Sequence, residues 1–223
     1  MKKTKQWQGQ LKGYVVEKTI DRYLAERYGG EWTLRQPISV LPPPPPLLIR
    51  QIREGRGGCS MTALTSVFIW LRQKHHLTQL PEAPDALYEM ISRIAAGHGF
   101  RPAKGRTNPF RLTAIIRRVW RWLDRPGTGR SWLMAGPRRM LRLTGQNQPY
   151  LMNIAFGHYG FHTVTVTGCQ LWQRKAAGRE SRRLLLQVQD GWTTTPRYLD
   201  VSAMRRPWSG HFTFYSLTVV RPG

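Results

Sequence analysis

The segment Gly57-Gly58-Cys59-Ser60-Met61-Thr62-Ala63-Leu64 places one cysteine directly behind two glycines. An unbroken helix-forming run continues from Thr62 to about Arg72, so we expect Cys59 to lie at a helix N-terminus. The N–H groups of a first helical turn have no partner within the helix, and the helix dipole adds positive potential there. Both effects favour a thiolate at Cys59 and can stabilise an oxyanion beside it, while Gly58 lets a substrate backbone approach closely.

The length and composition indicate one folded domain or a domain with an arm. The chain has 223 residues, 40% of them hydrophobic, which is ample for a core. Its two cysteines, Cys59 and Cys169, are too few for a disulfide framework or a structural zinc site, so we expect a reducing compartment. Neither a signal peptide nor an apolar run of membrane-spanning length is evident, and we therefore predict a cytoplasmic protein without a membrane span.

The charge balance is strongly basic, with 35 Lys and Arg against 12 Asp and Glu, a formal net charge of +23. Such a chain attracts polyanions, and a nucleic acid or another anionic partner is one interpretation. The other is an arginine-rich surface that is simply solvated. The basic residues are scattered and form no dense run or recognised nucleic-acid motif, which favours this second interpretation.

The N-terminal part reads as a basic arm that ends in a polyproline run, Pro42 to Pro46. Five consecutive prolines form a stiff polyproline II segment without backbone donors. We therefore predict a boundary there, with the arm over residues 1–46 and the main domain over 47–223. Within the arm, apolar residues from Tyr14 to Leu24 fall roughly on one helical face, and Gly29-Gly30 would end that helix.

Helices precede strands in the main domain. After the helix that begins at Cys59, helical patterns begin at Pro84, at Asn108-Pro109 and at Pro137. Beyond Gly145 the period changes to that of strands. The expected strands cover residues 150–156, 162–167, 184–189, 197–201 and 212–220. This segregation predicts an α+β fold with a helical lobe followed by an antiparallel β-sheet lobe.

A nucleophilic cysteine needs a base within hydrogen-bond reach, and the base needs a group that orients it. His162 opens one predicted strand and Asp190 closes the next, 28 residues later (190 minus 162). That spacing fits a hairpin, which would bring both side chains to the same end of the sheet. Asp190 would then hold the imidazole, and Trp192 would shield their hydrogen bond from water.

Three motifs in this order resemble the papain-like cysteine peptidase superfamily, most closely its bacterial branch of bacteriocin-leader (double-glycine) peptidase-like proteins. They are Gly58 to Ala63, Gly157 to Gly168 and Val188 to Trp192. The resemblance implies a papain-like fold with Cys59 as nucleophile, His162 as general base and Asp190 as orienter, and no cofactor. The family's oxyanion-hole glutamine has its nearest counterpart in Gln51. Ser60-Met61 stands where the family usually has Gly-Pro.

The sequence therefore predicts a cysteine peptidase or related thiol-dependent amide hydrolase that acts on a peptide or protein. Acyl transfer by the same triad stays open, because the residues alone do not separate it from hydrolysis. The alternative is a basic nucleic-acid- or protein-binding module on an idle papain-like fold, with Cys59 a small core residue. His158 is a second candidate base. A metal cluster of Cys59, Cys169, His158 and His162 would lack any recognisable ligand spacing, so no metal is predicted.

Overall fold

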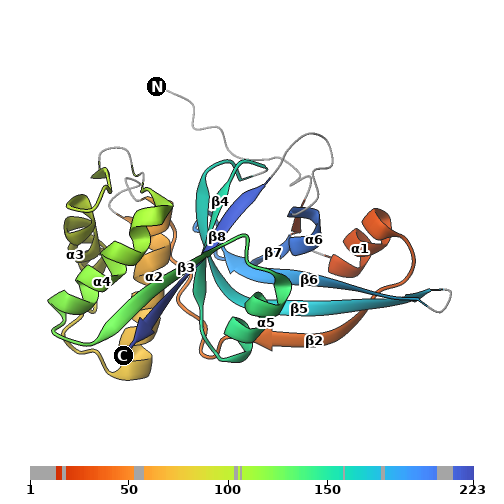
Figure 1. Cartoon of the computed structure of the whole chain (residues 1–223), viewed down its shortest axis with the longest axis horizontal. Coiled ribbons are helices and arrows are strands. Elements are labelled where there is room, and N and C mark those ends of the chain that lie inside the picture. The colour runs from red at the N-terminus through yellow and green to blue at the C-terminus, as the bar shows by residue number, and fades with distance from the viewer. Residues whose placement is uncertain are drawn as a thin grey trace.

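A single antiparallel sheet carries His162 at the start of one strand and Asp190 directly after the end of another. The computed structural model describes residues 14–16, 19–52, 58–102, 105, 107–157, 159–176, 179–204 and 213–223. Within them, eight strands and six α-helices make a mixed α and β fold (Figure 1). The strand order is β1-β7-β6-β5-β4-β8-β3, and β2 pairs with β5 beside that path. The strands are β1 (Val15–Val16), β2 (Thr33–Ser39), β3 (Gly127–Leu133), β4 (Tyr150–Ala155), β5 (His162–Ala176), β6 (Arg179–Gln189), β7 (Arg197–Asp200) and β8 (Phe214–Pro222).

The long strand β5 organises the sheet, because β4, β6 and β2 all pair with it. Val164 and Val166 alternate with threonines along its first half and are fully buried, as the sequence period predicts. Its first residue, His162, pairs with Ile154 of β4, and Thr165 pairs with Gln189 at the end of β6. The start of β5 and the end of β6 therefore meet at one end of the hairpin, as predicted.

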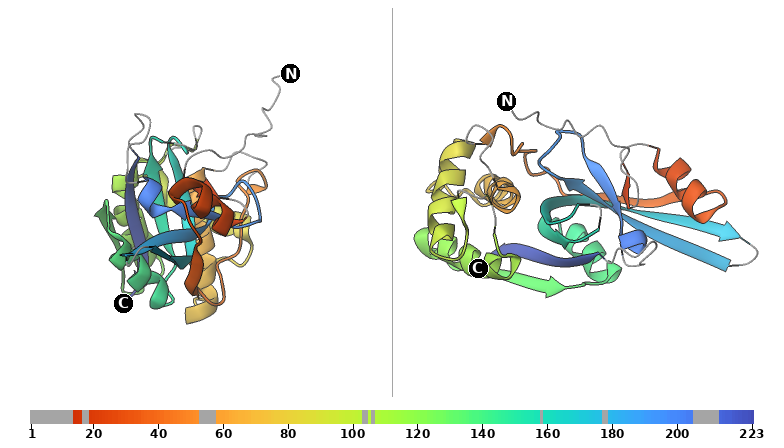
Figure 2. Two further views of the ribbon diagram at one scale, coloured as in Figure 1. Left: turned by 90° about the vertical axis from the view of Figure 1, so that its right-hand side faces the viewer. Right: turned by 90° about the horizontal axis from the view of Figure 1, so that it is seen from above.

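Three helices gather at one end of the sheet, while α1 lies at the other (Figures 1 and 2). The helices are α1 (Ile20–Tyr28), α2 (Cys59–His75), α3 (Pro84–Ala96), α4 (Leu112–Trp122), α5 (Pro137–Gly145) and the short α6 (Val201–Met204). Asn108 precedes the 3-10 turn Pro109–Arg111, and its side chain accepts a hydrogen bond from the Phe110 backbone N–H at 3.0 Å. This cap satisfies an otherwise unpaired donor, and the turn leads directly into α4. The helical segment therefore begins at Asn108-Pro109, as predicted.

Burial explains why α2 and α4 pack where they do. Twelve consecutive residues of α2, Ser60 to Leu71, are buried, so the helix is surrounded on all sides. Only one face of α4 is buried, including Ile116 and Trp120, and the arginines of its other face stay exposed. No helix among the residues that the structure describes is long and apolar enough to cross a bilayer.

Two segments of the predicted N-terminal arm, Val15–Val16 and Thr33–Ser39, are strands of the sheet. Val15 and Val16, expected in a helix, instead pair with Leu199 and Tyr198 of β7. The helix of the arm starts only at Ile20 and ends before Gly29. Strand β2 runs along the second half of β5, which the sequence did not predict.

The polyproline run, predicted as a boundary, threads between α2 and the sheet. Its carbonyl groups accept hydrogen bonds from Trp70 at Pro42 (2.8 Å), from Gln189 at Pro44 (2.7 Å) and from Ser66 at Pro45 (2.6 Å). Prolines offer acceptors but no donors, so buried side-chain donors from two elements can hold them. The run is thus held by side chains of both α2 and β6, and it helps to fix this helix against the sheet.

Candidate functional site

Cys59 is the first residue of α2, as the glycine-cysteine motif predicts. Gly58 precedes it in an extended conformation, and its backbone N–H donates a hydrogen bond to the buried Tyr88 hydroxyl of α3 at 2.8 Å. A Cβ atom on Gly58 would lie 2.5 Å from the carbonyl oxygen of Gly105. The site therefore needs glycine here because two backbone segments touch.

We expect Gly58→Ala to displace Cys59. The added methyl group must push away a backbone carbonyl rather than a flexible side chain, so the start of α2 has to shift. We predict a rate of Cys59 alkylation at least ~10-fold lower and destabilisation of about 1–3 kcal/mol in urea unfolding. Gly145→Ala is the matched control, since a Cβ there meets nothing within 4 Å. Equal behaviour of both variants would contradict the packing described here.

His162 opens β5 and is 7% exposed. Its ring stacks on the Tyr159 ring, with 5.3 Å between the centroids and 13° between the planes. The centroid of the Trp192 ring lies 4.3 Å from that of His162. Nε2 of His162 lies 2.7 Å from the backbone carbonyl oxygen of Asp190. A carbonyl only accepts, so Nε2 carries the proton, and Nδ1 is the nitrogen left to exchange a proton with a thiol.

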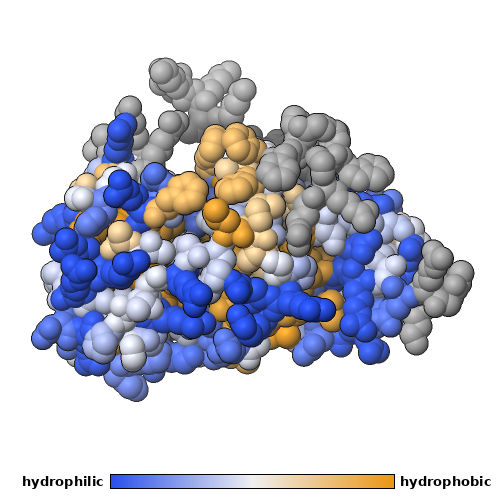
Figure 3. Space-filling view, in the orientation of Figure 1, coloured by the Kyte–Doolittle hydropathy of each residue, from blue (hydrophilic) through white to orange (hydrophobic). Residues whose placement is uncertain are grey.

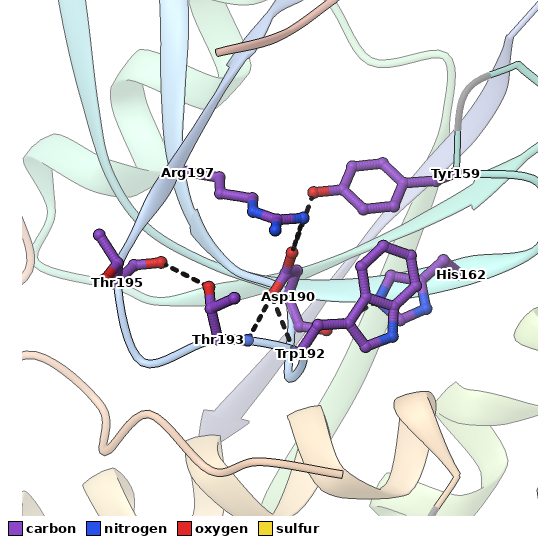
Figure 4. Close-up of polar contacts among 7 residues, drawn as sticks. All are labelled: Tyr159, His162, Asp190, Trp192, Thr193, Thr195 and Arg197. Carbon is purple, nitrogen blue, oxygen red and sulfur yellow. Dashed lines mark hydrogen bonds and ion pairs between the residues drawn. The ribbon is translucent and has the colours of Figure 1, made fainter. Parts of the chain in front are cut away.

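Asp190 holds His162 in a different way from the one predicted. Its carboxylate faces away from the imidazole: Oδ2 forms an ion pair with Arg197 at 2.7 Å and accepts from the Tyr159 hydroxyl at 3.4 Å (Figure 4). Oδ1 accepts from the backbone N–H groups of Trp192 and Thr193. The residue is the predicted one, but its main-chain carbonyl, not its carboxylate, is the hydrogen-bond partner of the ring.

The surroundings of Cys59 favour its thiolate. Burial raises the pKa of the thiol, but the hydrogen bond to His162, the charge interaction with it and a hydrogen bond from the Thr163 backbone lower it, to about 7. Cys169 offers a contrast within the same chain. It is 1% exposed in the middle of β5, and burial raises the pKa of its thiol to about 11. The thiolate is thus favoured at Cys59 and disfavoured at Cys169.

A buried chain of polar side chains joins the helix that begins at Cys59 to the strand that begins at His162. Ser60 and Thr163, which follow Cys59 and His162 by one residue each, have hydroxyl oxygens 2.7 Å apart. Thr163 donates to Oδ1 of Asn153 at 3.0 Å, so Ser60 donates to Thr163. Asn153 in turn donates to Ser216 of β8 at 3.1 Å. This chain fixes α2 against three strands beside the site, and it gives Ser60 a role that glycine could not fill.

A cleft of about 760 Å³ opens beside Cys59 and His162. Pro109 and Phe110 line it from the helical side, and β4, β8 and the residue before His162 line it from the sheet side. Phe110 and Phe161 are 66% and 78% exposed. Hydrophobic side chains also gather on this part of the surface in Figure 3. His162 is the only titratable base among the described lining residues, so a neutral, extended chain with apolar groups suits the cleft.

The remaining predicted residues lie as follows. Gln51 is exposed in a turn and lines neither the cleft nor the small cavity behind Cys59, so its role in an oxyanion hole stays a prediction. His158 lies outside the described residues. The described residues contain no group of three or more His, Cys, Asp or Glu that could hold a metal ion.

Sequence reasoning missed Arg197, Tyr159 and the chain from Ser60 to Asn153. Arg197 opens the strand after Asp190, seven residues along the chain, and a strand-opening arginine close behind an Asp-Gly turn was the available signal.

Comparison with known proteins adds no assignment: no protein-family model matches the chain, and no curated protein matches it.

Proposed function

We propose that this chain is a thiol-dependent amide hydrolase of the papain-like cysteine peptidase kind, acting on a peptide or protein. The observation that carries the proposal is the placement of Cys59 beside the His162 ring, which lowers the pKa of the thiol, while the Asp190 carbonyl oxygen lies 2.7 Å from Nε2 of that ring. A helix-start cysteine packed against a sheet that bears its base supports the papain-like arrangement.

Each chemical step has a group in the site. The Cys59 thiolate attacks the carbonyl carbon, and the resulting oxyanion can accept hydrogen bonds from N–H groups of the first turn of α2, such as that of Cys59. His162, protonated on both nitrogens, donates the Nδ1 proton to the leaving amine, and the C–N bond breaks. Water then adds to the thioester with the neutral ring as base, which releases the acid and restores the thiol. An amine in place of water would give acyl transfer.

The test is cleavage of a mixed peptide library, followed by mass spectrometry, with wild type, Cys59→Ala and Cys169→Ala. We expect new peptide termini with wild type and Cys169→Ala and none with Cys59→Ala. Addition of a small primary amine separates hydrolysis from transfer through the mass of the new terminus. Absence of both cleavage and a thioester adduct on Cys59 would favour the idle-fold alternative, and cleavage by Cys59→Ala would assign the activity elsewhere.

A further inference from the structure

We propose that the edge of the sheet beside α5 is a binding site for single-stranded nucleic acid. The site, called the basic edge below, consists of Arg130 and Trp132 of β3 with Arg138, Arg139 and Arg142 of α5. Strand β3 ends the strand order of the sheet, so its outer side has no neighbouring strand among the described residues. None of these five residues lines the cleft at Cys59, and the basic edge is therefore separate from the proposed active site.

Three of the four arginines of the basic edge line a hollow of about 680 Å³. Arg138, Arg139 and Arg142 line it, together with Ala135, Gly136 and Pro137. Within the described part of the chain, the ion pairs found use other side chains, so no carboxylate within 4 Å neutralises these guanidinium groups. A concave surface with three uncompensated guanidinium groups concentrates positive potential and fits phosphate groups, which arginine can bind through two hydrogen bonds.

The charge is concentrated in this part of the sequence. Residues 108–149 contain nine arginines, no lysine and a single acidic residue, Asp124. Among the arginines, Arg117, Arg118 and Arg121 are exposed on α4, which flanks β3 on its other side. Figure 3 shows strongly hydrophilic side chains over the region where Figure 1 places α4, β3 and α5. The exclusive use of arginine favours a phosphate-bearing partner over a general acidic one.

An aromatic ring lies among these charges. The guanidinium groups of Arg130 and Arg139 stand 5.1 Å and 4.5 Å from the centroid of the Trp132 ring. This stacking pre-orders two cations from different elements, which lowers the entropy cost of binding phosphates. Arginine interleaved with an aromatic side chain is the composition of single-strand sites.

The experiment is fluorescence anisotropy with a labelled mixed-sequence single-stranded DNA of about 20 nucleotides, titrated at several salt concentrations. The test variant is Arg130→Glu/Arg138→Glu/Arg142→Glu, in exposed residues that leave Arg139 in place. The control is Arg35→Glu/Arg50→Glu/Arg93→Glu, which removes the same charge from exposed positions elsewhere. We expect about 30-fold weaker binding for the test variant, a salt slope reduced by about 2, and less than about 3-fold change for the control. Circular dichroism checks that both variants fold.

Several results would overturn the proposal. Absence of binding by wild type in low salt, or equal weakening by both triple variants, would mean that the basic edge is only a solvated surface. Tighter binding to a duplex of the same length, or to phosphatidylserine vesicles, would assign the edge to a different partner. Cys59→Ala should bind like wild type, because the basic edge does not include the cleft.

Discussion

His162→Ala is expected to move the titration of Cys59 from about pH 7 to above the ordinary thiol value of 9.0. The variant loses both interactions with His162 that lower the pKa of the thiol, so burial, the largest influence on it, outweighs the remaining hydrogen bond from the Thr163 backbone. At pH 7 the thiolate fraction falls from about one half to about 1%, and alkylation by iodoacetamide should slow by ~10–50-fold. Hydrolysis should fall further, by about 10³-fold, because the leaving amine also loses its proton donor.

The control for this prediction is His75→Ala. His75 is exposed in the last turn of α2, far along the same helix, and its replacement removes an imidazole of the same kind from the chain. We expect wild-type alkylation rates at every pH. If the two histidine variants react alike, the reactivity of Cys59 owes nothing to His162, and the proposed proton exchange between them fails.

Asp190→Ala should destabilise the fold by ~3–5 kcal/mol. The carboxyl side chain is fully buried against Arg197, whose side chain is 13% exposed, and it also accepts two backbone N–H groups and the Tyr159 hydroxyl. Removing it leaves a buried cation without this partner and opens the turn that presents the Asp190 carbonyl to His162. Urea unfolding measures the loss. Glu82→Ala breaks a surface contact to Arg72 at 3.8 Å and should cost less than about 1 kcal/mol.

Asp190→Asn separates the two possible roles of this residue. The amide can still accept from the Trp192 and Thr193 backbone N–H groups, so the turn and the main-chain carbonyl should keep their places. Because the ring is held by that carbonyl, we expect the Cys59 titration near its wild-type position and a less than ~10-fold loss of hydrolysis. A loss of about 10⁴-fold, typical when a carboxylate orients the base, would show that the carboxylate turns to His162 during the reaction.

Much of the helical part could be predicted, because its signals are local. Pro84, Asn108-Pro109 and Pro137 mark helix starts at or next to the observed ones, and Cys59 begins α2. The period-two alternation after His162 likewise locates β5. In these segments, propensity, capping and hydrophobic period agree, so tertiary contacts have no local preference to override.

Besides β1, strands β2 and β3 could not be predicted, because they contain proline or glycine, which are typical of loops. Strand β3 begins Gly-Thr-Gly, which reads as a loop, but a Cβ on Gly127 would lie 2.3 Å from the Trp120 ring. The glycine is there because α4 packs directly on the strand. Strand β2 contains Pro37, which is tolerated because the strand pairs on only one side among the described residues.

The proximity of His162 and Asp190 was predictable, but the atoms through which they meet were not. The hairpin spacing brings His162 and Asp190 together, and the two side chains were expected to meet. Arg197 lies on the following strand and captures the carboxylate, which only the pairing of β6 with β7 places within reach. The register between neighbouring strands depends on tertiary contacts. No local sequence pattern could therefore show that His162 meets the carbonyl of Asp190 and not its carboxylate.

The most direct measurement is the rate of Cys59 alkylation in the wild-type protein as a function of pH, followed by peptide mass spectrometry. Cys169 in the same sample is the internal standard for a buried thiol, with its pKa raised to about 11. A Cys59 thiolate paired with His162 predicts half-maximal reactivity near pH 7, while Cys169 stays unmodified across the neutral range. Reactivity of Cys59 that rises only above about pH 8.5, as in a free thiol, would contradict the account.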